Sequence, residues 1–213
     1  GVRADGATIR AIMRDLGLKA AGPRAKVRTT VPAQNLDERP DLLRRDFTAD
    51  EPGKNLCGDI TYVRTWAGFI YLATVLDCCT KKVVGYAMAD HMRTSLVCQA
   101  IDMAVRRCPV EEGVTIFHSD RGSQYTSQRF LDHLNSYGIR PSVGRTGVCW
   151  DNAWAESFNA TLKNERVHRM VYPTKDKAVK DIASWIELTY NHVRLHSALG
   201  YRTPNEVERE FLG

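Results

Sequence analysis

The sequence predicts an α/β protein: a mixed five-stranded sheet flanked by helices, preceded by a short helix and a linker. Three strand-like apolar runs follow one another between residues 59 and 89, with turns short enough for antiparallel hairpins. Beyond residue 94, helical and strand-like patterns alternate, which is typical of a sheet covered by helices. One carboxylate, Asp120, follows the carboxyl end of a strand-like run, where open α/β sheets keep their ligand sites.

The first part of the chain predicts a helix and then a linker. Apolar residues recur at helical spacing between residues 6 and 17, and Gly17 ends the pattern. Four prolines and frequent charges interrupt residues 21–54, so we expect a linker without regular structure. Leu42, Leu43 and Phe47 are the residues that could dock part of this linker on the core.

The predicted sheet begins with three antiparallel strands, at Asp59–Thr65, Phe69–Asp77 and Lys82–Ala89. The middle run is apolar on both faces, so we expect it to be covered on both sides. A helix begins near Thr94, and the fourth strand is Val114–Phe117.

Three further elements complete the predicted core. A helix runs from a Thr126 cap to Gly138, and Ile139–Val143 forms the fifth strand. Asp151 is predicted to cap the next helix, and Thr174 to open the last long one. Between them, residues 144–150 hold two glycines and no periodicity, either as a plain connector or as a flap over a substrate.

The helix after Asp151 carries two stripes at spacings of three and four residues. The apolar stripe is Ala155, Phe158 and Leu162, and the polar stripe is Asn152, Glu156, Asn159 and Lys163. Glu156 and Lys163 therefore share one helix face.

Composition restricts the function classes. No apolar run approaches the roughly 18 residues of a membrane helix, and the six cysteines show no CxxC spacing that would indicate zinc. We expect them to be reduced thiols. The net charge is +5, and residues 1–30 hold seven basic residues against two acidic ones, which favours a polyanionic partner or a solvated tail.

Three carboxylates are the candidate catalytic residues. Asp120 follows the fourth strand, Asp59 opens the first, and Glu156 lies on the helix after Asp151. Each alone is more ordinarily a helix cap or a solvated turn, but three that converge repel one another unless cations neutralise them. Oxygen ligands suit Mg²⁺ or Mn²⁺, and two such ions about 4 Å apart can activate a hydroxyl and stabilise the leaving oxygen of a phosphodiester.

Together these stretches resemble the DDE transposase and retroviral-integrase superfamily, most closely the integrase core encoded by the second reading frame of bacterial insertion sequences. The resemblance runs from about Asn55 to Val207. The matching motifs are Gly58–Tyr62, His118–Tyr125, Asp151–Ala153, Glu156–Phe158, Leu162–Glu165, Tyr190–Asn191 and Arg194–Tyr201. Many relatives have Trp where this chain has Leu56, which affects packing and not chemistry.

The resemblance implies a ribonuclease H-like core over residues 55–213, a linker over 21–54, and a remnant of a helix-turn-helix DNA-binding region over 1–20. It implies metal-dependent DNA cleavage and strand transfer of an insertion sequence, with Asp59, Asp120 and Glu156 holding two Mg²⁺ or Mn²⁺ ions. The expected DNA contacts, to element ends and target, are Lys163, Arg121, Asn152, Asn159, Arg145, Arg194, His196, Arg10 and Arg14.

The resemblance also implies partners and a location. We expect a homo-oligomer on DNA, a partner or fusion from an upstream reading frame, no membrane association, and action in the bacterial cytoplasm at the nucleoid. Two alternatives remain open: a nuclease of the same fold that only hydrolyses, and an inactive DNA-binding relic. Arg194 and His196 could equally satisfy the end of a helix, and His118 favours a structural hydrogen-bonding role.

Overall fold

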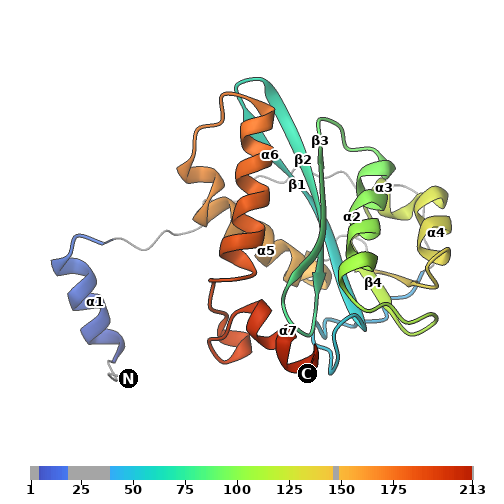
Figure 1. Cartoon of the computed structure of the whole chain (residues 1–213), viewed down its shortest axis with the longest axis horizontal. Helices are drawn as coiled ribbons and strands as arrows, with labels where there is room; N and C mark the ends of the chain where they lie inside the picture. Colours follow the sequence, from blue (N-terminus) through green and yellow to red (C-terminus); the bar gives the residue numbers. More distant parts are fainter. Residues whose placement is uncertain (1–4, 19–38, 146–148, 213) are drawn as a thin grey trace.

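A five-stranded mixed sheet forms the centre of the molecule in the computed structural model, which describes residues 5–18, 39–145 and 149–212 (Figure 1). The strand order is β3-β2-β1-β4-β5, in which β1–β2 and β2–β3 pair antiparallel and β1–β4 and β4–β5 pair parallel. The strands are β1 (Asn55–Thr65), β2 (Gly68–Asp77), β3 (Val83–Ala89), β4 (Ile116–Ser119) and β5 (Arg140–Val143). The predicted mixed five-stranded sheet is confirmed.

Helices cover both faces of this sheet. The α-helices are α1 (Gly6–Asp15), α2 (Thr94–Arg107), α3 (Ser123–Thr126), α4 (Gln128–Asn135), α5 (Ala153–Glu165), α6 (Lys175–Ser184) and α7 (Pro204–Leu212). Shorter turns are the 3-10 helices η1 (Cys149–Asn152), η2 (Val167–Arg169) and η4 (Ser197–Leu199), and the π-helix η3 (Trp185–Tyr190), which continues α6.

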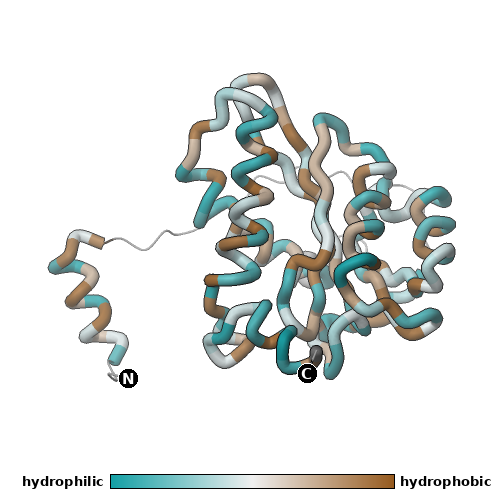
Figure 2. The backbone as a smooth tube through the Cα atoms, viewed as in Figure 1, coloured by the Kyte–Doolittle hydropathy of each residue, from teal (hydrophilic) through white to brown (hydrophobic). Residues whose placement is uncertain are grey.

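Each face of the sheet has its own hydrophobic core. Leu72 and Leu76 of β2 pack with α5 and α6 on one side, while Ala73 and Val75 pack with α2 and α4 on the other. Because β2 is apolar at successive positions, it must be covered on both faces, as the sequence predicts. Figure 2 shows hydrophobic residues along these central strands.

The short parallel pairing of β1 with β4 positions the candidate site. The register ends at Cys57 opposite His118, although β1 continues to Thr65. Asp59 and Asp120 each lie two residues beyond this last pair, where the paths of β1 and of the segment after β4 separate. Gly58 lets β4 approach closely, since a Cβ there would lie 2.4 Å from the ring of Phe117.

The helices of the structure differ from the prediction in two places. The helix expected from a Thr126 cap is divided into α3 and α4, and the cap of α4 is Ser127, whose hydroxyl accepts from Phe130 N at 3.3 Å. The Thr126 hydroxyl instead donates to the Gly122 carbonyl at 3.2 Å. Thr174 caps α6 as predicted, whereas α7, with Pro204 at its first position, was not predicted.

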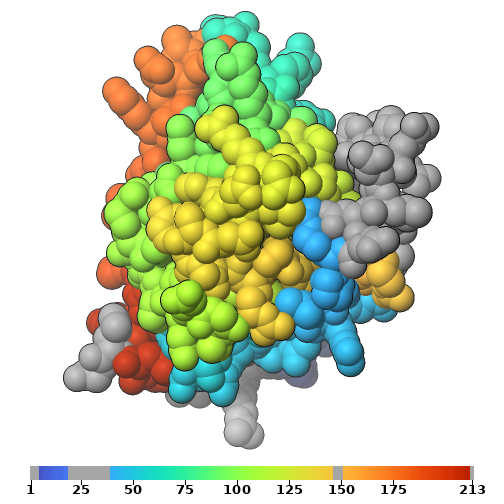
Figure 3. Space-filling view, turned by 90° about the vertical axis from the view of Figure 1, so that its right-hand side faces the viewer, coloured from blue at the N-terminus to red at the C-terminus, as the bar shows by residue number. Residues whose placement is uncertain are grey.

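Part of the predicted linker is well packed. Leu43 is buried and Phe47 packs against the same core. Leu42 N donates to Ser142 Oγ at 2.9 Å, and Val143 N donates to the Pro40 carbonyl at 3.3 Å, so this segment covers the outer edge of β5. Figure 3 shows it in blue beside the yellow residues of α4 and β5. Residues 21–38 of the expected linker lie outside the described residues.

At the opposite edge of the sheet, one side chain pairs with the first residue of β3. Asn191 is 1% exposed; its Oδ1 accepts from Val83 N at 2.9 Å and its Nδ2 donates to the Val83 carbonyl at 3.0 Å. The side chain thereby pairs with β3 as a neighbouring strand would. The Asn191 carbonyl accepts from Asn205 N at 3.0 Å, which attaches α7 to the same place.

The N-terminal helix α1 matches its predicted extent. Asp5 caps it through a 2.7 Å bond from Thr8 N, and none of its residues is buried. Among the residues that the structure describes, no helix combines the length and the apolar character needed to cross a membrane. The division of the chain into a recognition remnant, a linker and a core stays a prediction.

Candidate active site

The three predicted carboxylates come from three elements around the point where β1 and β4 separate. Asp59 lies on β1, Asp120 directly follows β4, and Glu156 lies in the first turn of α5. Asp59 Oδ1 accepts from Ile60 N at 2.8 Å, and Asp120 Oδ1 accepts from Gly122 N at 2.9 Å, which fixes both carboxylates locally.

These carboxylates lie close enough to influence one another electrostatically. Burial raises the pKa of Asp59 to about 7, and the negative charges of Asp120 and Glu156 contribute to this rise. Burial and the charge of Glu156 also raise the pKa of Asp120. Glu156 therefore disfavours the charged form of both aspartates, and Asp120 disfavours that of Asp59, as expected where carboxylates are gathered at one site.

The donor set fits a hard divalent cation. All three side chains offer oxygen, and the buried Asn159 Oδ1 adds a fourth oxygen with no hydrogen-bond partner among the described residues. Over the same part of the chain, no three acidic, histidine or cysteine side chains stand in a ready metal-binding arrangement.

Two residues expected to contact DNA have a different place. Asn152 and Asn159 are 4% and 7% exposed. Asn152 Nδ2 donates to the Gly58 carbonyl at 3.1 Å, and Asn159 Nδ2 donates to Asp59 Oδ2 at 2.8 Å. These amides hold α5 against β1, and Asn159 also orients Asp59; their contacts to DNA stay a prediction.

Lys163, on the same helix as Glu156, lies close to Asp59. Burial lowers its pKa, while the negative charge of Asp59 acts to raise it. Its Nζ lies 4.8 Å from the centre of the Tyr62 ring, a cation–π contact that the sequence did not predict. Lys163 is therefore a cation beside the site, as its position two turns beyond Glu156 suggested.

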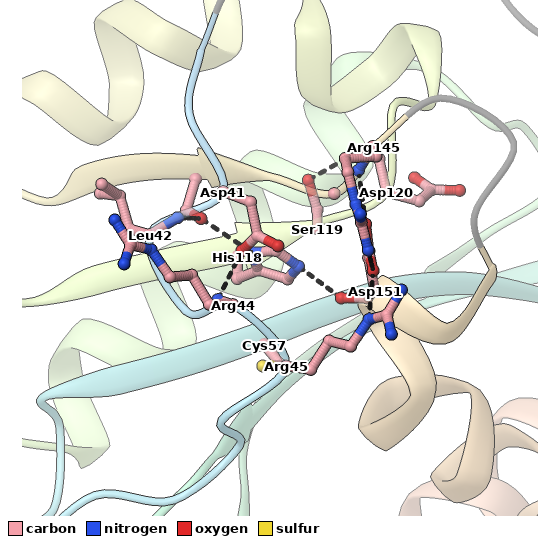
Figure 4. A network of polar contacts seen from close by, with 12 residues as sticks. Asp41, Leu42, Arg44, Arg45, Cys57, His118, Ser119, Asp120, Arg145 and Asp151 are labelled. Carbon is pink, nitrogen blue, oxygen red and sulfur yellow. Dashed lines mark hydrogen bonds and ion pairs between the residues drawn. The ribbon is translucent and has the colours of Figure 1, made fainter.

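Asp151 does not cap α5; it anchors two arginines (Figure 4). Its carboxylate is 1% exposed and accepts from Arg45 Nε at 2.8 Å and from Arg145 Nε at 2.9 Å. The backbone N of Arg145 also donates to it at 2.9 Å. These bonds hold the pKa of Asp151 well below its usual range, so it stays charged at neutral pH. The predicted cap is wrong, because the chain forms η1 before α5 begins.

His118 joins the same network from β4. Its Nε2 lies 2.6 Å from the Asp151 carbonyl, which can only accept, so Nε2 carries the proton. Nδ1 then accepts from Ser142 Oγ at 2.8 Å. Burial lowers the pKa of His118, which favours this neutral form. The predicted structural role for His118 agrees with this geometry.

The remaining predicted DNA contacts fall into three groups. Arg121 Nε donates to the Gly144 carbonyl at 2.7 Å, beside Arg145, which is exposed. Arg194 forms an ion pair with Glu165 at 3.0 Å, whereas His196 is 7% exposed and burial lowers its pKa to about 4. His196 is therefore a neutral core residue and not a surface DNA contact.

Arg10 and Arg14 are exposed on α1. Residues 146–148 of the predicted flap lie outside the described residues, as does the side chain of Cys149. The other five cysteines are free thiols, and Cys57 and Cys78 are buried with their sulfur atoms 3.4 Å apart.

Sequence comparison relates most of the chain to proteins of insertion sequences. Profiles of the integrase core domain match residues 49–149 and 137–204. The transposase for insertion sequence element IS904 of Lactococcus lactis is 36% identical, over 93% of this chain and 78% of that protein. The transposase InsF for insertion sequence IS3A of Escherichia coli is 36% identical, over 96% of this chain and 71% of that protein.

Solved structures resemble the fold at lower identity. The intasome of simian T-cell lymphotropic virus with a PP2A regulatory subunit contains a chain that superposes with a TM-score of 0.64 at 19% identity, over 76% of this chain and 56% of that one. The HTLV-2 integrase catalytic core domain in complex with magnesium gives a TM-score of 0.55 at 17% identity, over 75% of this chain and 98% of that one. The predicted ribonuclease H-like fold of integrase cores is confirmed.

Proposed function

Because the chain belongs to the insertion-sequence transposases with an integrase core domain, we propose that Asp59, Asp120 and Glu156 are its catalytic residues. The observation that carries this assignment is their mutual electrostatic effect at the separation of β1 and β4. The protein is a polynucleotidyl transferase that acts on DNA, and its homologues imply that it assembles as an oligomer on DNA. We also propose that a partner encoded by an upstream reading frame acts with this chain, and that the chain acts at the bacterial nucleoid.

The family relationship implies dependence on a divalent metal, and we propose two Mg²⁺ or Mn²⁺ ions held by the three carboxylates. When bound, such ions activate the attacking oxygen and stabilise the leaving oxygen of a phosphodiester. Asn159 keeps Asp59 oriented through the 2.8 Å bond described above. Lys163, Arg121 and Arg145 supply positive charge for the phosphates on either side.

The proposed reaction has two steps at this one site. In cleavage, a water oxygen attacks phosphorus at the element end, and the bond to the 3′ oxygen breaks, which leaves a 3′-hydroxyl. In strand transfer, that hydroxyl attacks a phosphodiester of the target, so one bond forms as another breaks. The chain positions the reactants and stabilises charge, and no covalent protein–DNA intermediate is required. Strand-transfer products in a gel assay distinguish this function from hydrolysis alone.

Asp59→Asn is expected to stabilise the metal-free protein. The folded-state pKa of Asp59 is raised from 3.8 to about 7, so its contribution to stability is complete below pH 4 and is lost as the pH rises toward 7. The melting temperature of the variant relative to wild type should therefore increase between pH 4 and 7, on the order of 8–16 °C at pH 7. Mg²⁺ or Mn²⁺ should raise the melting temperature of wild type and reverse the difference.

Asp132→Asn, on the exposed face of α4, is the control for the loss of one charge. Because the variant is compared with wild type at each pH, the contribution of the buried histidines to stability cancels. The pKa values of His118 and His196 are lowered, so their contribution changes in the opposite direction over the same range. A wild type whose melting is indifferent to metal would contradict a converged carboxylate site.

Lys163→Ala is expected to weaken DNA binding at every sequence tested. If Lys163 neutralises one phosphate, the slope of the logarithm of affinity against the logarithm of salt concentration should shrink by about 1. Lys180→Ala removes an exposed lysine from α6 and should leave the slope unchanged. Fluorescence anisotropy at several salt concentrations measures both; equal slopes for Lys163→Ala and wild type would remove Lys163 from the DNA path.

A further inference from the structure

An exposed pair of aromatic rings lies on the β1–β2 hairpin. Tyr62 and Phe69 are 46% and 45% exposed, and their ring centres are 5.6 Å apart with the planes at 87°. Tyr62 pairs with Tyr71 in the antiparallel register, so Phe69 is its diagonal neighbour on the same face. The fold thus holds the Tyr62 ring in place without covering it.

Lys163 lies between the Tyr62 ring and the carboxylate of Asp59 and interacts with both. The Lys163 amine lies 4.8 Å from the ring centre and is also close enough to feel the charge of Asp59. Along β1 the Cα of Tyr62 lies three residues beyond that of Asp59, on the order of 10 Å, and because these side chains start from opposite faces of the strand, Lys163 is the contact that relates the ring to the carboxylate. That distance corresponds to about three stacked nucleotides of one DNA strand.

We propose that Tyr62, supported by Phe69, stacks on an unpaired nucleobase within about three nucleotides of the phosphate that reacts. This inference rests on the proposed function, since it places the base relative to that site. Inside a duplex both faces of a paired base are covered by its neighbours, so away from a duplex end an exposed ring can take only a base that has left the stack. The substrate class is therefore duplex DNA with single-stranded character beside the cleavage point.

Charge favours a nucleotide over a second copy of the chain as the occupant. A protein surface laid on this pair would cover Lys163 and would have to supply an additional anion to it. A nucleotide brings both parts at once, because its base has a π-face for Tyr62 and its phosphate is an anion for Lys163. Phosphate contacts alone would not discriminate a frayed end from a paired one.

The test compares two labelled duplexes of the same arbitrary sequence, one blunt and one ending in a three-nucleotide single-stranded extension. Affinities are measured by fluorescence anisotropy in EDTA, so that no reaction occurs. Wild type is expected to bind the extended duplex ~10-fold more tightly, as one base–aromatic stack would give. Tyr62→Leu should reduce this ratio to about 1 and leave the affinity for the blunt duplex unchanged, whereas Tyr62→Phe should keep the ratio.

Trp66→Leu is the matched control, because Trp66 is an aromatic residue of the same hairpin and is 77% exposed. It should keep the wild-type ratio. Phe69→Leu keeps Tyr62 and should partly lower the ratio of affinities for the extended and blunt duplexes. This variant provides a second test if Tyr62→Leu is too unstable to measure.

An unchanged ratio in Tyr62→Leu, or no preference in wild type, overturns the proposal. An unchanged ratio with an altered molecular mass by light scattering would assign the aromatic pair to contacts between copies instead. The binding assay contains no metal, so a failure of the stacking proposal does not bear on the proposed function. Failure of the proposed function would instead be seen as strand transfer by variants of the three carboxylates.

Discussion

Glu156→Gln is expected to lower both DNA cleavage and strand transfer by roughly 100-fold or more. The substitution keeps the size and helix propensity of the side chain but removes a charge that would hold a metal ion. The fold should be unaffected, because the apolar face of α5, formed by Ala155, Phe158 and Leu162, is buried independently of Glu156. DNA binding should persist or rise slightly, since one negative charge near the phosphates is lost.

The measurement is paired: joining of an oligonucleotide with a free 3′-hydroxyl to a plasmid, and DNA affinity by anisotropy. Glu165→Gln is the matched control, because it makes the same change on the same helix at an exposed residue that pairs with Arg194. It should react at the wild-type rate. If Glu156→Gln also does so, Glu156 is not a catalytic residue. Asp151 could not replace it, since two arginines already engage that carboxylate.

Asp151→Asn is expected to destabilise the protein by about 2 kcal/mol, which lowers the melting temperature by roughly 4–8 °C. The amide can still accept one hydrogen bond, but Arg45 and Arg145 lose the charge they share. Both arginines are about half exposed, with side-chain exposures of 48% and 60%, so solvent screening limits the loss. Thermal melts at pH 7 measure the effect.

The pH dependence separates this effect from simple repacking. The folded-state pKa of Asp151 is lowered, so its contribution is present above about pH 4 and is lost as the pH falls. The difference between wild type and Asp151→Asn should therefore shrink toward pH 3. Arg45→Ala combined with Asp151→Asn should be less destabilising than the sum of the two single changes. A variant that melts like wild type at pH 7 would show that the network carries no stability.

Much of the fold could be predicted because local patterns and tertiary packing agree. The double-sided apolar run of β2 required two covering layers, and the spacing of three and four residues on α5 identified its buried face. The division between α3 and α4 could not be predicted, because Thr126 and Ser127 are both good caps and only the chain's path after β4 decides between them.

The site was predicted less completely, because several of its contacts join distant parts of the chain. Arg45 and Asp151 are 106 residues apart, and nothing in either local pattern indicates that they meet. The polar stripe of α5 was identified correctly, but periodicity does not reveal whether a polar face meets solvent or another polar group. Asn152 and Asn159 face β1, a placement that the pattern did not indicate.

The pairing of Asn191 with β3 has a consequence for solubility. An outer strand presents unpaired N–H and C=O groups to which a strand of another molecule can add, and such additions lead to aggregates. Asn191 occupies both groups of Val83, and α7 is joined to the same residue through Asn205. At the other edge, the segment that contains Pro40 and Leu42 shields β5. The sheet is thereby closed to intermolecular strand addition at these points, which disfavours fibrils even where many copies of the chain are brought close together.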